Sequence, residues 1–231
     1  MSTEPVTSLE DQRALQILST EHWSLLTSRS LAYNEAFTRG GMFLTFLSMS
    51  FVALALLAQG MSFGDQFLSI AAVVLAFDFV IGLTTYGRII GANQDDLRAV
   101  HGMARIRHGY TQIAPITARY FTSATNDDVE SVLGAYGGGG SSAVGTLWYA
   151  MTTSGGMIGL IVSMVGGVLA GVLSLIVGAS GGVPVWIGIG GAVLVLVAIT
   201  MLTFGAVPGY QAGLTVLFPK EPTKPAADPE D

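Results

Sequence analysis

The chain of 231 residues is 51% hydrophobic and only 11% charged, with 30 glycines and a formal net charge of −6. Soluble domains carry about 25% charged residues, so this composition predicts an integral membrane protein rather than a soluble domain. The absence of cysteine excludes disulfide bonds, thiolate metal sites and cysteine nucleophiles.

Residues 1–40 are predicted to form a cytoplasmic, amphipathic helical segment. Ser8 with Asp11 three residues later resembles a helix-capping pair, and Ser19 or Thr20 resembles a second cap further on. Four apolar side chains at helical spacing share one face: Trp23, Leu26, Tyr33 and Phe37. We expect this face either to lie among lipid headgroups or to pack on the protein's own cytoplasmic part.

Residues 41–90 are predicted to form a first transmembrane hairpin. A helix crosses a bilayer with about 20 apolar residues. Residues 41–60 have no charge, and residues 66–87 have one, Asp78. Both stretches are therefore interpreted as spans.

Residues 148–208 are predicted to form a second, glycine-rich hairpin. No charged residue occurs between 146 and 219, a stretch too long for one span. The sequence ASGGVP at 179–184 interrupts it, because glycine and proline mark turns. The third span is expected near 151–178 and the fourth near 185–207.

The basic residues predict how the chain is threaded. All ten Lys and Arg residues lie before the first span, between the second and third, or after the fourth. The positive-inside rule makes that side cytoplasmic, so both termini are expected in the cytoplasm. The predicted fold is an all-α membrane protein with four transmembrane helices, plus amphipathic N-terminal and cytoplasmic juxtamembrane helices, in the cell membrane.

Residues 91–147 are predicted to be a cytoplasmic helical region that opens with a basic helix ending before Pro115. Its small and aliphatic face, which includes Gly102 and Gly109, is flat enough for another helix to approach closely. Beside this face lies what we call the basic stripe, which consists of Arg98, His101, Arg105, Arg107 and His108.

Three interpretations of the basic stripe remain open. It can meet anionic lipid headgroups, where each basic residue contributes about 1 kcal/mol. It can pair with nearby acids, namely Asp95, Asp96, Asp127 and Asp128. It can also bind a phosphate-bearing ligand or line a cytoplasmic vestibule. The two histidines are seven residues apart, too far to share an ion on one straight helix, so no metal or cofactor is predicted.

The rest of this region is expected to be less regular. Asn126 is predicted to cap a short helix with an acidic first turn. The glycines at 137–140 read as a flexible joint, and no Lys-Ser/Thr follows that would make them a phosphate-binding loop. Residues 209–231 are predicted to be a disordered cytoplasmic tail.

The third span carries a small residue at every fourth position: Gly155, Gly159, Ser163, Gly167 and Gly171. Such a face lets helix backbones approach closely in lipid. The fourth span adds Gly188, Gly190, Gly191 and Ala192. The partner of this face is either the fourth span of the same chain, another subunit, or the wall of a pore.

Asp78 is the one ionisable residue inside a predicted span. A charge at mid-bilayer costs from about 2.5 kcal/mol upwards, so Asp78 is expected to face the bundle interior, a partner or water. Its candidate hydrogen-bond partners are the hydroxyls of Thr45, Ser48 and Ser50. The carboxyl is interpreted as a cation site, a proton relay or a pore ring, or else as a neutral structural group.

Two sequence blocks resemble a family of uncharacterised integral membrane proteins from actinobacteria. They are EHWSLLTSRSLAYNEAFTRGGMFLTFLS at 21–48 and RIRHGYTQIAPITARYFTSATNDD at 105–128. With the spans between and after them, the resemblance covers most of the chain. It implies a membrane location and a similar length, and no particular chemistry.

No catalytic constellation is visible, so the protein is not expected to be an enzyme. The first hypothesis is a homo-oligomeric channel or pore with a cation as candidate permeant, Asp78 near the path and the basic stripe near its cytoplasmic mouth. The alternative is a non-catalytic membrane module that binds anionic lipid or a cytosolic partner through the basic helix. Expected partners are membrane lipids and further copies of the chain, and not nucleic acid.

Overall fold

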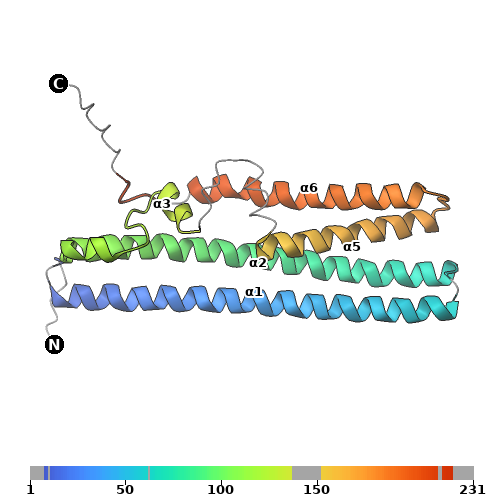
Figure 1. The fold of residues 1–231 in the computed structure, drawn as a ribbon, viewed down its shortest axis with the longest axis horizontal. Coiled ribbons are helices and arrows are strands. Elements are labelled where there is room, and N and C mark those ends of the chain that lie inside the picture. The colour runs from blue at the N-terminus through green and yellow to red at the C-terminus, as the bar shows by residue number, and fades with distance from the viewer. Residues whose placement is uncertain (1–7, 10, 62, 137–151, 213–214, 221–231) are drawn as a thin grey trace, which may run out of the picture. The chain divides into compact units, whose positions relative to one another are not determined.

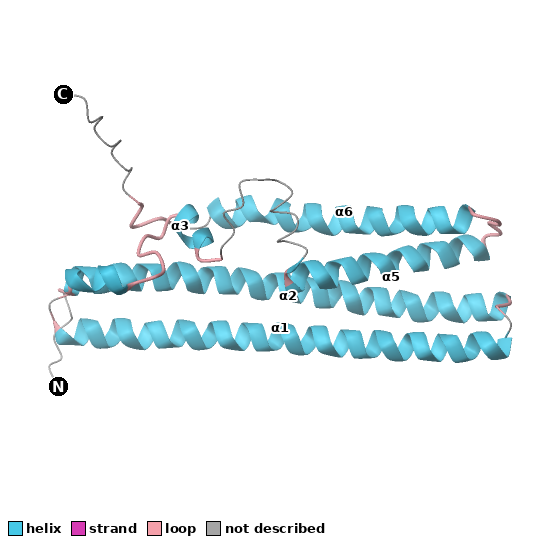
Figure 2. Cartoon of the chain, in the orientation of Figure 1, coloured by secondary structure: helices cyan, strands magenta, loops and turns pink. Residues whose placement is uncertain are grey.

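A computed structural model describes residues 8–9, 11–61, 63–136, 152–212 and 215–220. The described residues are mainly helical and contain no strand (Figure 2). In chain order the elements are α1 (Gln12–Met61), α2 (Asp65–Ile113), the 3-10 helix η1 (Pro115–Tyr120), α3 (Val129–Gly134), α5 (Ser154–Ile176) and α6 (Val183–Ala212). α1, α2, α5 and α6 are long and apolar enough to span a membrane, which confirms the predicted all-α membrane-type fold.

α1 and α2 are single helices of 50 and 49 residues (Figure 1). Each predicted span is therefore continuous with the helix predicted beside it, and no new helix begins at Gly91. Neither helix contains proline, and a glycine in mid-helix costs only about 1 kcal/mol. Continuing the helix is cheaper than nucleating a second one.

The start of α1 differs from the prediction. Asp11, rather than Ser8, precedes the first helical residue and accepts a hydrogen bond from the backbone N–H of Arg13 at 2.9 Å. The second cap predicted at Ser19 or Thr20 is wrong, because α1 runs through both residues. The Thr20 hydroxyl instead donates to the Gln16 carbonyl at 2.8 Å, as hydroxyls inside helices do.

The predicted break between the third and fourth spans is confirmed. α5 ends at Ile176 and α6 begins at Val183. Gly178 and Gly181 adopt φ values of 94° and 66°, which side chains with a Cβ rarely tolerate. The two glycines therefore allow the tight reversal that returns the chain along α5.

The chain divides into two compact units, and each is described by itself. Unit 1 comprises Met1–Arg29, Asp96–Gly139 and Gly213–Asp231. Unit 2 comprises Ser30–Asp95 and Gly140–Ala212. α1 and α2 contribute residues to both units, whereas the described parts of α5 and α6 belong to unit 2.

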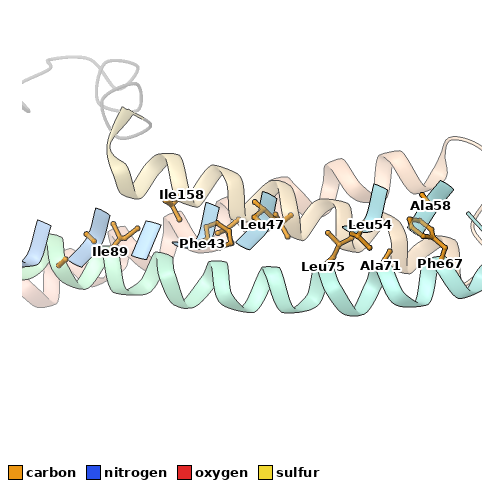
Figure 3. Close-up of a cluster of buried hydrophobic side chains, with 13 residues drawn as sticks. Phe43, Leu47, Leu54, Ala58, Phe67, Ala71, Leu75, Ile89 and Ile158 are labelled. Atoms are coloured by element: carbon orange, nitrogen blue, oxygen red, sulfur yellow. The ribbon is translucent and has the colours of Figure 1, made fainter. Parts of the chain in front are cut away.

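The hydrophobic core of unit 2 lies where α1, α2 and α5 meet (Figure 3). Phe43 on α1 and Ile89 on α2 are each 1% exposed, and Val162 on α5 is fully buried. Gly82 on α2 makes this approach possible, because an added Cβ would lie 2.7 Å from Val162 and 3.0 Å from Phe43.

The small residues of the third span pack within the chain. A Cβ on Gly167 would lie 2.6 Å from the Gly188 carbonyl oxygen on α6, so the two backbones are in contact. A Cβ on Gly159 would instead meet the Tyr86 ring on α2 at 2.9 Å. The expected face therefore serves two partners: its first part packs on α2 and its later part on α6. Gly190, by contrast, has open space around it.

Candidate functional site

The side chain of Asp78 is fully buried on α2. The Ser50 hydroxyl on α1 donates a hydrogen bond to Asp78 Oδ1 at 3.0 Å. The other carboxyl oxygen, Oδ2, is also buried and has no hydrogen-bond partner. The expectations that Asp78 faces the bundle interior and that a serine hydroxyl satisfies it are thus both confirmed, and one oxygen is left over.

Two of the three predicted hydroxyl partners lie elsewhere. The Ser48 hydroxyl donates to the Leu44 carbonyl at 2.7 Å, and the Thr45 hydroxyl donates to the Gly41 carbonyl at 2.9 Å. Both side chains are exposed on α1. Positions two and five residues from Ser50 point to other faces of a helix, so neither can reach Asp78.

The surroundings of Asp78 offer few oxygen ligands to a metal ion. A divalent ion such as Ca²⁺ takes six or more oxygen ligands, whereas this site offers one carboxyl and one hydroxyl. Among the described residues, no group of three or more His, Cys, Asp or Glu side chains could hold a metal ion.

The protein itself covers part of the basic stripe of α2. His101 is 5% exposed. Arg105 Nε donates to Asp127 Oδ2 at 2.8 Å, and the His108 ring stacks on Phe218 with centroids 4.0 Å apart. The predicted pairing with Asp127 is confirmed for Arg105. A later segment of the chain also lies against this part of the stripe. Contact between the stripe and lipid headgroups stays a prediction.

That segment comprises residues 215–220, which we call the C-terminal strap. The carboxylate of Asp127 is fully buried and accepts backbone hydrogen bonds from Leu217 at 2.9 Å and Phe218 at 2.7 Å. Asp128 Oδ1 accepts from the backbone N–H of Lys220 at 3.2 Å. Asn126 donates its side-chain amide to the Phe218 carbonyl at 3.4 Å.

The predictions for these segments are corrected accordingly. A disordered tail was predicted from residue 209, but α6 continues to Ala212 and the strap is held by side chains of unit 1. Asn126 does not cap α3: the cap is Asp128, which accepts from the backbone N–H of Ser131 at 3.0 Å. The glycine joint at 137–140 and the remaining tail at 221–231 lie outside the described residues.

The hydrogen bonds to the strap also set the acidity of the two carboxylates. Burial alone would raise the pKa of Asp127, but the N–H groups of Leu217 and Phe218 and the Arg105 guanidinium outweigh burial and hold it below its ordinary value. Burial alone would also raise the pKa of Asp128. The hydrogen bonds from Ser131 and Lys220 outweigh the effect of burial and lower the pKa of Asp128.

Acid is therefore expected to release the strap. A carboxylate with a lowered folded-state pKa contributes stability that is complete above its unfolded pKa, about 3.9, and is lost as the pH falls through the folded value. Hydrogen exchange at Leu217 and Phe218, normalised to the intrinsic rate at each pH, should show full protection at pH 6 and loss of protection below about pH 4. Protection that persists unchanged to pH 2 would contradict this assignment.

A second buried carboxylate, Asp96, joins two helices of unit 1. Asp96 is 2% exposed and pairs with the Arg29 guanidinium from α1, and Tyr136 donates its hydroxyl to Asp96 Oδ2 at 2.6 Å. The sequence offers Asp96 as one possible partner of the basic stripe, and the structure pairs it with a cation from the other helix. Arg29 and Tyr136 carried no signal beyond their residue types.

The small face of the basic helix packs closely against another helix, as predicted. A Cβ on Gly102 would lie 2.9 Å from Leu25, and one on Gly109 would lie 3.1 Å from Leu18. The two helices therefore run antiparallel in unit 1, with α1 seated on this face. The aromatic face of α1 is left uncovered: Trp23 is 66% exposed and Phe37 67% exposed, with Leu26 and Tyr33 also exposed.

No protein-family model, curated protein or solved structure matches the chain. The resemblance carried by residues 21–48 and 105–128 therefore stands on those residues alone. What the protein does has to be argued from its own geometry.

Proposed function

We propose that the protein is an integral membrane protein that passes a proton or a small monovalent cation across the bilayer by way of Asp78. The observation that carries the proposal is the buried carboxyl of Asp78, whose Oδ2 has no partner inside an otherwise apolar bundle. Ionisable groups at this depth are expensive and in most known cases serve transport or proton relay.

The burial of Asp78 favours a path inside each chain. A ring of carboxylates between copies would require Asp78 on the outer surface of the bundle, whereas its side chain is fully buried within one chain. Assembly into a homo-oligomer stays a prediction and is not needed for this path. We further propose the topology that the basic residues indicate, with both termini and unit 1 in the cytoplasm of a bacterial cell.

The proposal is tested by flux into liposomes containing the purified protein and a pH-sensitive dye. With a potassium diffusion potential as driving force, the wild-type protein should acidify the interior faster than empty liposomes do. Asp78→Asn keeps the shape of the side chain and removes its titratable group, so it should reduce the rate to the background. A second assay, with Na⁺ or K⁺ outside the liposomes and an indicator for that ion inside, distinguishes proton transport from Na⁺ or K⁺ transport.

Asp65→Asn is the matched control. Asp65 is an exposed acid at the start of the same helix, so its loss should leave the flux unchanged. Ser50→Ala removes the hydroxyl that Asp78 accepts from and should alter the pH at which flux is half-maximal. Equal flux in wild type and Asp78→Asn, or no flux above background for any species, would refute the proposal.

The second candidate is a non-catalytic membrane module that binds lipid or a cytosolic partner through unit 1. Exposed apolar side chains favour it, notably Trp23 at 66%, Tyr120 at 68% and Ile116 at 64% exposure. Neutralisation of Arg105 by Asp127 weakens the electrostatic part of this idea. Absence of flux in the experiment above, with the protein correctly folded, would move the assignment to this candidate.

A further inference from the structure

Arg107 differs from the other buried cations of unit 1. Arg105 is neutralised by Asp127, and Arg29 is neutralised by Asp96. Arg107 is half-buried, yet no hydrogen bond or ion pair to another described residue accompanies it. A guanidinium that loses water without gaining a counterion is energetically unfavourable, so Arg107 lacks a counterion among the residues that the structure describes.

A second unpartnered group lies beside Arg107. Tyr110, one turn further along the same face of α2, stacks its ring on His22 of α1 with centroids 6.0 Å apart. The Nδ1 atom of His22 is buried and has no hydrogen-bond partner. The antiparallel contacts of Gly102 with Leu25 and of Gly109 with Leu18 bracket this place, so His22 and Arg107 lie on facing stretches of the two helices.

Neighbouring positive charges act on both Arg107 and His22. Burial and the neighbouring charge of Arg29 lower the pKa of Arg107, and burial and the charge of Arg107 lower the pKa of His22. Arg29 has a carboxylate of its own in Asp96 and so does not need another anion. What remains is a guanidinium with five N–H donors next to an imidazole nitrogen, a combination that an oxyanion would complete.

We propose that Arg107 and His22 form a binding site for a phosphate group. The planar guanidinium offers two parallel N–H donors that match two phosphate oxygens, and the imidazole, as the tautomer with Nδ1–H, supplies a further donor. Arg107 provides the half-exposed edge through which the ligand enters, and His22 provides the buried end. The phosphate is carried either by a soluble compound or by a lipid headgroup. The site is separate from Asp78 and does not depend on the proposed transport.

The test uses the full-length protein in phosphatidylcholine nanodiscs and inorganic phosphate as probe, compared with chloride at equal ionic strength. At about ten times its dissociation constant, phosphate should raise the melting temperature of the wild type by about 3 °C. Arg107→Gln should abolish the shift. Arg119→Gln, which removes an exposed cation of unit 1 that contacts Tyr120, should retain the shift.

Two further results separate a binding site from a structural role. Without phosphate, Arg107→Gln should melt at the same temperature as the wild type or higher, because it removes a cation that has no partner. Phosphate should also shift the Nδ1 resonance of His22 in the wild type and not in Arg107→Gln. This second readout does not depend on stability.

The source of the phosphate is resolved by nanodiscs that contain phosphatidylglycerol and no free phosphate. If these raise the melting temperature of the wild type but not of Arg107→Gln, the ligand is a headgroup. If only free phosphate does so, the ligand is soluble. The proposal is overturned if neither probe shifts the wild type, or if wild type and Arg107→Gln shift equally.

Discussion

Replacing Asp127 by alanine is expected to release the C-terminal strap and to destabilise unit 1 by about 3 kcal/mol. The carboxylate is fully buried and accepts from the N–H groups of Leu217 and Phe218 and from Arg105. Alanine leaves all three donors without an acceptor, and each buried donor left unpaired costs about 1–3 kcal/mol. The exposed part of the Arg105 guanidinium will form hydrogen bonds with water, which limits the total loss of stability.

Two measurements check this result in detergent-solubilised protein. Chemical unfolding gives the loss of stability, and limited proteolysis reports whether residues 215–220 become accessible. Glu130→Ala is the matched control, because Glu130 is an exposed acid in the neighbouring helix α3 and its loss should change stability by less than about 0.5 kcal/mol. Asp127→Asn should lose less stability than Asp127→Ala and more than Glu130→Ala, because its amide oxygen still accepts one N–H. An unchanged cleavage pattern in Asp127→Ala would show that the carboxylate does not hold the strap.

The sequence could predict the spans but not what covers the basic stripe. Hydropathy is a local property, so each apolar stretch predicts its own helix. A polar helical face, in contrast, is equally compatible with water, headgroups or another part of the same chain. Asp127 could be named from its charge and proximity in sequence. The strap could not, because Leu217 and Phe218 are apolar residues that bind through their backbone and stand about 90 positions further on.

The partner of Asp78 was within reach of sequence reasoning. The buried residues of α1 in this region recur at spacings of four, three and four: Phe43, Leu47, Ser50 and Leu54. Ser50 interrupts an otherwise apolar core face, whereas Thr45 and Ser48 lie off it. A hydroxyl on a core face needs a buried acceptor, and Asp78 is the one carboxylate in the facing span. Helical phase would therefore have selected Ser50 from the three candidates.

The continuity of α1 and α2 had a weaker signal. The change from an apolar to an amphipathic sequence at the ends of the predicted spans suggested separate helices. Breaking a helix requires an alternative for the backbone hydrogen bonds, and neither helix contains a proline that would remove one of them. The amino-acid composition therefore changes along each helix, whereas the helical conformation of the backbone continues.

Replacing Gly167 by alanine is expected to destabilise the α5–α6 hairpin by about 2 kcal/mol, although alanine favours a helix over glycine by about 1 kcal/mol. The added Cβ would lie 2.6 Å from the Gly188 carbonyl oxygen and 2.7 Å from Ala192 Cβ. Backbone atoms cannot turn aside as the end of a side chain can, so the two helices must separate. The same substitution at Gly190 meets open space and should be neutral or slightly stabilising.

The comparison of Gly167→Ala with Gly190→Ala isolates the effect of contact, because residue type, helix propensity and membrane setting are matched. Unfolding of the purified protein in mixed detergent gives both values, and equal effects would rule out close contact at Gly167.

The Gly167→Ala substitution also bears on Asp78. On its other side α5 packs Gly166 against Phe79, where an added Cβ would lie 2.8 Å from the ring. α5 therefore cannot move closer to α2, and the clash has to be relieved by movement of α6 away from α5. The packing next to Asp78 then stays in place. Gly167→Ala should accordingly weaken the hairpin while retaining flux, and Gly166→Ala should disturb both.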